Sequence, residues 1–196
     1  TTYEWTNNNT AIGLAASGVG DIPSFVVVGS SVVSEIATIE VTPTYDFNGV
    51  TCTGNPETFT ITVNPGAQVD PVAGQILCVG ESTDEILFTT SNTDGLTTYE
   101  WTNNNTAIGL AASGIGDIPS FTATNDTASA LVATIEVIPT YENGGVTCTG
   151  NPETFNITVL SEISITSFDI SDAIDCNDPN SGIIDITVSG GSGVYD

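Results

Sequence analysis

The chain has 196 residues, with 24 Asp and Glu residues and no Lys, Arg or His, so its formal net charge is −24. No salt bridge to Lys or Arg can form, and nothing neutralises nucleic-acid phosphates, which excludes nucleic acid as a partner. Anionic membrane surfaces repel the chain, and no stretch reaches eighteen apolar residues, so we expect no membrane insertion. Apolar residues make up 39% of the sequence and alternate as in strands, which argues against disorder.

One long repeat organises the sequence. Residues 1–25 and 97–121 are the same except that Val19 becomes Ile115, and TCTGNPETF recurs at 51–59 and 147–155. Trp5 and Trp101 lie 96 residues apart, as do Cys52 and Cys148. A period as long as a whole domain predicts beads on a string rather than a solenoid of short units.

Short strands are predicted throughout the first copy. Apolar and polar residues alternate over 3–5, 37–41 and 59–63, as expected for strands with one buried face. Asparagines at 7–9 mark a turn. The stretch 12–18 predicts at most a short turn, because glycine stands at both ends.

The second copy repeats these strands over 99–101, 133–137 and 155–159, and adds one over 85–90. Clusters of turn residues lie at 91–95 and 143–145. About seven short strands in some 95 residues predict an all-β, immunoglobulin-like β-sandwich.

The third segment carries an alternating strand over 184–188 and a turn over 189–191. We therefore predict three parts: a sandwich domain over 1–65 that lacks its first strands, a complete domain over 66–160, and the start of a further β repeat over 161–196. The chain does not begin with Met and has no basic leader region, so we expect it to be a fragment.

Four cysteines are present, and none lies in a CxxC pair. Within the complete domain we predict a disulfide between Cys78 and Cys148, which would close a loop of about 70 residues and stabilise the fold by roughly 4 kcal/mol. Cys52 and Cys176 would then pair with cysteines outside the chain. The alternative is buried free thiols. Disulfides would place the protein in an oxidising, extracellular setting.

The second copy resembles the PKD-like (polycystic-kidney-disease-like) repeats of very large surface proteins in gliding bacteria that use type IX secretion. The residues that carry the resemblance are Cys78 and 99–101, 108–110, 113–116, 121, 133–139, 148–150 and 155–159. Cys176 and 181–195 are similar to the opening of an SprB-type repeat, named after a gliding-motility adhesin. The resemblance implies a secreted cell-surface adhesin or filament and no catalytic residues. The complete lack of Lys and Arg departs from it.

Two features are candidates for sugar binding. Trp5 and Trp101 are predicted to be core residues packed on the disulfide, and stacking platforms for sugars are the alternative. The loop 103–105, which is Asn-Asn-Asn, is predicted to be a turn; presentation of its amides to sugars is the alternative.

Acidic and amide side chains crowd the start of the third segment, and their oxygens are ligands of the kind that Ca²⁺ takes. The calcium candidates are Asp172, Asp175, Asn177 and Asp178, with solvated acidic turns as the alternative. The spacing is not that of an EF-hand loop. No other cofactor is expected. Asp126-Thr127-Ala128 resembles a bacterial O-glycosylation sequence, which makes Thr127 a candidate glycan site.

Without His, Lys or Arg, most general bases and oxyanion-stabilising groups are lacking, so we expect no enzyme. Two functions then fit the repeats. The first is a structural stalk or filament region of a very large secreted bacterial adhesin, used in surface attachment or gliding, whose partners are neighbouring domains and like chains. The second is a multivalent module that binds glycans or proteins through its loops.

Overall fold

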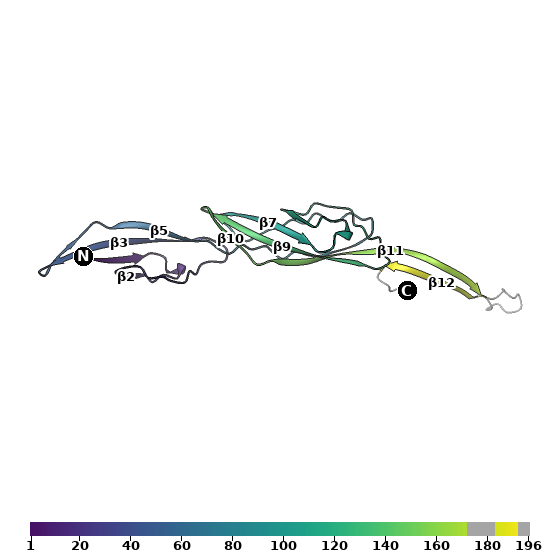
Figure 1. Ribbon diagram of the computed structural model, residues 1–196, viewed down its shortest axis with the longest axis horizontal. Coiled ribbons are helices and arrows are strands. Elements are labelled where there is room, and N and C mark those ends of the chain that lie inside the picture. Colours follow the sequence, from purple (N-terminus) through teal and green to yellow (C-terminus); the bar gives the residue numbers. More distant parts are fainter. Residues whose placement is uncertain (172–182, 192–196) are drawn as a thin grey trace. The chain divides into compact units, whose positions relative to one another are not determined.

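The computed structural model describes residues 1–171 and 183–191, and they form an all-β protein with sandwich-like, immunoglobulin-like sheets (Figure 1). The predicted fold class is confirmed. The chain divides into two compact units: Thr1–Val69 with Thr90–Thr98 and Pro139–Asn151, and Asp70–Thr89 with Tyr99–Ile138 and Pro152–Asp196. The predicted domain boundaries at 65/66 and 160/161 stay predictions.

The first sheet is organised around one long strand, β3. Its order is β2-β1-β3-β4, with β5 also paired to β3, and every pairing is antiparallel. The strands are β1 (Thr2–Asn7), β2 (Ser17–Val19), β3 (Glu35–Phe47), β4 (Val50–Thr53) and β5 (Glu57–Val63). Asn48 and Gly49, both with positive φ, form the two-residue turn between β3 and β4, as tight hairpins require.

The second sheet repeats this plan around β9 and adds two strands to β11. Its order is β12-β11-β9-β7-β8; β10 pairs with β9, and β6 pairs in parallel with β11. The strands are β6 (Gln75–Cys78), β7 (Leu96–Asn103), β8 (Ser113–Ile115), β9 (Leu131–Asn143), β10 (Val146–Thr149), β11 (Glu153–Ser171) and β12 (Ile183–Gly191). Strand β11 continues past residue 160, where a new repeat was predicted to begin.

Three predicted elements differ from those observed. The turn predicted over 189–191 is instead the end of strand β12. The stretch 12–18 was expected to be a turn, whereas each copy has a short 3-10 helix, η1 (Thr10–Ile12) and η2 (Thr106–Ile108), followed by a three-residue strand. The strand predicted over 85–90 is not regular. Ile86 forms an isolated bridge to Ile118, and the backbone N–H of Phe88 donates to the Asp117 side chain instead of a neighbouring strand.

The core follows the predicted alternation. Phe155, Ile157 and Val159 of β11 are buried on one face, against Ala133 and Ile135 of β9. In the first copy Trp5, Ile12, Leu14, Ala37 and Ile39 form the corresponding cluster. Within residues 1–171 and 183–191, no helix is both long and apolar enough to cross a membrane.

Candidate functional site

A polar cluster in the first unit joins residues of the two sequence copies. We call it the linking cluster: Ser34 and Asn64 of the first copy, and Asn92, Tyr141 and Asn143 of the second. All five lie in the same compact unit. Hydrogen bonds between polar groups hold the cluster together.

Two hydrogen bonds join Asn64 and Asn143, one to the Asn143 backbone and one between their side chains. Asn64 Nδ2 donates to the Asn143 carbonyl oxygen at 3.0 Å, and Asn143 Nδ2 donates to Asn64 Oδ1 at 3.3 Å. Asn143 Nδ2 also donates to Ser34 Oγ at 2.9 Å, and Ser34 Oγ donates to Asn64 Oδ1 at 3.0 Å. Three side chains from two copies therefore form a closed set of bonds.

Tyr141 and Asn92 extend the cluster to the backbone. The Tyr141 hydroxyl donates to the Thr93 carbonyl oxygen at 2.7 Å and lies 3.3 Å from Ser34 Oγ. Asn92 Nδ2 donates to the carbonyl oxygens of Ser31 and Gly66. Tyr141 is fully buried, whereas its counterpart Tyr45 is 49% exposed. Burial of polar groups is favourable only when they are hydrogen-bonded, and here they are.

This cluster was not predicted from the sequence, although the sequence holds a clue to it. Ser34, Asn64 and Asn143 stand where the copies differ, their counterparts being Ala130, Leu160 and Phe47. At these positions a hydrogen-bonding side chain in one copy is replaced by an apolar one in the other.

The two tryptophans are core residues, as predicted, but they do not pack on the predicted disulfide, because Cys78 and Cys148 are free thiols. Trp5 is 4% and Trp101 5% exposed, and their rings pack on Gly18 and Gly114. Burial removes them as sugar-stacking platforms. Among the described residues, neither indole N–H has a hydrogen-bond partner, so their contribution is packing rather than polar recognition.

The side-chain amides of the Asn103–Asn105 loop bond to backbone groups of the loop itself and of β9. Asn103 Nδ2 donates to the carbonyl oxygens of Leu110 and Ala111, and Asn103 Oδ1 accepts from the Asn105 N–H. Asn7 makes the same bonds to Leu14, Ala15 and Asn9 in the first copy. The loop is a turn, as predicted, and Asn103 is buried in it.

The predicted Cys78–Cys148 disulfide is wrong for this structure, because both cysteines are free thiols. Cys148 of β10 pairs with Tyr141, near the end of β9. Cys78 of β6 pairs with Leu160 of β11, and the residue before it, Val159, pairs with Leu131 at the start of β9. Ten residues of β9 therefore separate them, which is about 33 Å at strand spacing, whereas a disulfide needs Cα atoms within about 7 Å. The cysteines mark opposite ends of one sheet, which sequence spacing alone does not reveal.

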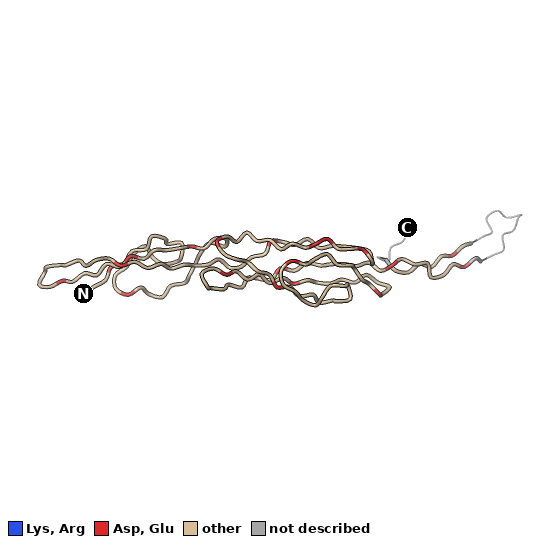
Figure 2. The backbone as a smooth tube through the Cα atoms, turned by 90° about the horizontal axis from the view of Figure 1, so that it is seen from above, with Lys and Arg blue, Asp and Glu red and all other residues tan. Residues whose placement is uncertain are grey.

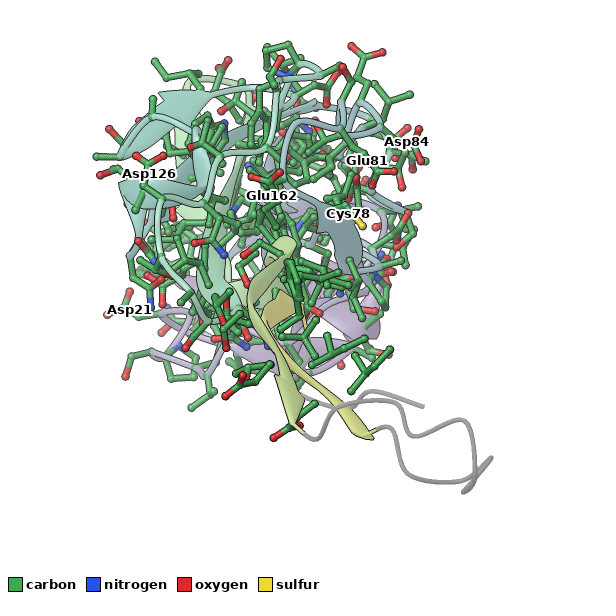
Figure 3. All side chains as sticks on the ribbon, turned by 90° about the vertical axis from the view of Figure 1, so that its right-hand side faces the viewer. Asp21, Cys78, Glu81, Asp84, Asp126 and Glu162 are labelled. Atoms are coloured by element: carbon green, nitrogen blue, oxygen red, sulfur yellow. The ribbon has the colours of Figure 1, made fainter. Side chains whose placement is uncertain are left out.

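The remaining thiols and acids are at the surface. Cys52 and Cys78 are exposed. The Cys78 N–H donates to Glu81 Oε2 at 2.7 Å, and Figure 3 labels both residues. Cys176 lies outside the described residues. Acidic residues are spread along the backbone in Figure 2.

The calcium candidates Asp172, Asp175, Asn177 and Asp178 also lie outside the described residues. In the part of the chain that the structure does describe, no three His, Cys, Asp or Glu residues lie close enough to hold a metal ion. Thr127, the candidate glycan site, is exposed; its hydroxyl donates to Asn125 Oδ1 at 2.7 Å within a turn. Glycosylation at Thr127 stays a prediction.

Comparisons with known proteins add a structural likeness only. No protein-family model matches the sequence, and the search of curated proteins also finds no match. A solved structure of the surface layer protein SbsC, domains 1–6, is similar with 14% sequence identity and a TM-score of 0.28. The alignment covers 94% of this chain and 24% of that one, so the chain spans about a quarter of the length of its match.

Proposed function

We propose that the chain is a structural repeat region, a stalk or filament segment, of a large secreted bacterial cell-surface adhesin. One observation carries the proposal: in both copies the same polar side chains form hydrogen bonds within the fold. Asn7 and Asn103 each bond to two backbone carbonyls and one N–H. The side-chain amides of these two residues are therefore used in stabilising the fold.

The linking cluster supports the same function. A stalk must hold successive domains together, and here Ser34, Asn64 and Asn143 join two copies with hydrogen bonds that no change of pH near neutrality titrates. The charge of −24 keeps neighbouring chains apart and soluble. Neighbouring domains of the same long chain, and like chains in a filament, are the partners.

The proposed location is the extracellular bacterial surface, with no catalytic activity. The resemblance to PKD-like and SprB-type repeats supports two further parts of the proposal, which are a role in gliding and export by type IX secretion.

Immunogold labelling of intact producing cells tests the proposal. Antibodies raised against residues 66–160 should decorate the cell exterior without permeabilisation. Label that appears only after the cells are opened would contradict the proposal.

A glycan array probed with the purified chain separates the stalk from the multivalent binder. A stalk predicts no saturable binding. Saturable binding that is lost when the 103–105 loop is altered, in a variant that keeps its melting temperature, would favour the binding module instead.

A further inference from the structure

The two copies present the same apolar side chains on one face, but only the second copy has this face covered. Tyr99 and Phe155 are 9% and 6% exposed, whereas their counterparts Tyr3 and Phe59 are 48% and 45% exposed. The tryptophans are buried alike in both copies, since Trp5 and Trp101 differ by only one percentage point. The residues of the first copy that pack beside this core, Ile61 and Val63, are only partly buried, whereas their counterparts Ile157 and Val159 are fully buried.

The segment Asp70–Thr89 covers this face in the second copy. The Phe88 ring lies 5.5 Å from that of Tyr99 and 6.5 Å from that of Phe155, between centroids. Ile86 bridges to Ile118, which is fully buried; its counterpart Ile22 is only partly buried. Two apolar side chains of the segment thus close the face.

The same segment also pairs with a strand edge. Strand β6 runs parallel to β11, with Ile157 opposite Gln75 and Leu160 opposite Cys78. The strand of the first copy that corresponds to β11 is β5. In the described part of the chain, β5 is paired with β3 alone. An unpaired edge beside exposed apolar side chains is a template for strand addition.

We propose that this bare face, formed by Tyr3, Ile22, Phe59, Ile61 and Val63, docks a polypeptide segment with the chemistry of Asp70–Thr89. The segment adds a parallel strand to β5, and the register of β6 on β11 places its Gln75 equivalent opposite Ile61. Its Phe88 equivalent covers Tyr3 and Phe59, and its Ile86 equivalent bridges to Ile22. The second copy supplies the template for every one of these contacts.

Charge sets the character of this association. The segment carries Asp70, Glu81, Asp84 and Glu85 without any cation, and the receiving chain is also acidic. Apolar contact and main-chain hydrogen bonds must therefore overcome repulsion between like charges. Binding should tighten as sodium chloride rises from 0.05 to 0.5 M, the reverse of what an ion-paired complex shows.

The test uses the full chain and a synthetic peptide of residues 66–90 with Cys78→Ser, under reducing conditions. Calorimetry should show saturable one-to-one binding, and hydrogen exchange should show new protection of backbone amides in β5. The Phe59→Glu variant should bind at least about tenfold more weakly, because a charge then sits in the apolar contact. Tyr3→Glu provides an independent variant should Phe59→Glu fail to fold.

The matched control is Val50→Glu, which adds the same charge at an exposed position of β4. It should bind as the unaltered chain does, and a peptide with Phe88→Asp should not bind. Absence of binding, or equal binding to Phe59→Glu and the unaltered chain, would overturn the proposal. A second result would also overturn the proposal: the chain alone forms a dimer that Phe59→Glu dissociates, and the peptide does not bind. The occupant of the face would then be a second copy of the chain.

Discussion

At the scale of single residues, the repeat provides each side chain with an internal comparison. Trp5 and Trp101 are buried against Gly18 and Gly114 in the same way, because an indole ring lies where a β-carbon would project. Asn7 and Asn103 likewise bind equivalent carbonyls. Equal environments predict equal effects of substitution in the two copies.

Substituting Gly114→Ala should destabilise the second copy by about 1–3 kcal/mol, because the added methyl group overlaps the Trp101 ring in a packed core. Gly18→Ala should have a similar effect in the first copy. Denaturant unfolding followed by tryptophan fluorescence measures both. Gly66→Ala, where no atom lies within 4 Å of the new methyl group, is the control and should change nothing.

Tyr141 and Tyr45 occupy equivalent positions in the two copies, but their substitutions should affect stability differently. Tyr141→Phe removes the hydrogen bond to the Thr93 carbonyl oxygen and should lower the free energy of unfolding by about 0.5–1.5 kcal/mol. Tyr45→Phe changes a half-exposed residue and should have no measurable effect. Equal effects of the two substitutions would mean that the linking cluster adds no stability.

At the scale of elements, the copies share their strands and differ in what covers them. Strand β11 is flanked by β9 and β6, whereas β5 pairs with β3 alone among the described residues. Phe155 is consequently buried between β9 and the segment that contains Phe88, while Phe59 is half exposed. The cover, rather than the strand sequence, sets how much each phenylalanine stabilises the fold.

Phe155→Ala should therefore cost about 3–5 kcal/mol, the usual range for a large core side chain. Phe59→Ala should cost less than about 1.5 kcal/mol, since nearly half of the side chain already contacts water. Urea unfolding of the two variants measures the difference. Similar costs would show that residues 1–65 bury Phe59 in solution.

Much of the strand pattern was predictable from the sequence, because alternation over 133–137 and 155–159 reports burial directly. Asn9 and Asn105, whose side chains cap the 3-10 helices, were seen only as turn residues, since three-residue helices leave no periodicity to read. The disulfide prediction failed because spacing along the chain does not say at which end of a sheet a cysteine lies. The linking cluster was not predicted, because Ser34, Asn64 and Asn143 lie far apart in the sequence at positions where the copies differ.

At the scale of the whole molecule, charge is the dominant feature. Twenty-four acidic side chains face no Lys, Arg or His, so their mutual repulsion is relieved only by solvent and counterions. Figure 2 shows acidic positions along both units and no basic ones. The fold is therefore stabilised by apolar burial and hydrogen bonds against a uniform repulsion.

Raising sodium chloride from 0.01 to 0.5 M should increase the melting temperature by several degrees, because the screening length falls from about 30 Å to a few ångströms. Tetramethylammonium chloride should act equally, since screening does not depend on the identity of the cation. Stabilisation by calcium alone, at matched ionic strength, would contradict simple screening and indicate a bound ion.

Mechanical unfolding of single chains held at their two ends tests the structural role most directly. A load-bearing repeat predicts a distinct force peak for residues 66–160, followed by a gain in contour length of about 300 Å as the domain extends. Tyr141→Phe and Phe155→Ala should lower the unfolding force, while Tyr45→Phe should not. Featureless extension without a force peak would contradict a stalk function for these repeats.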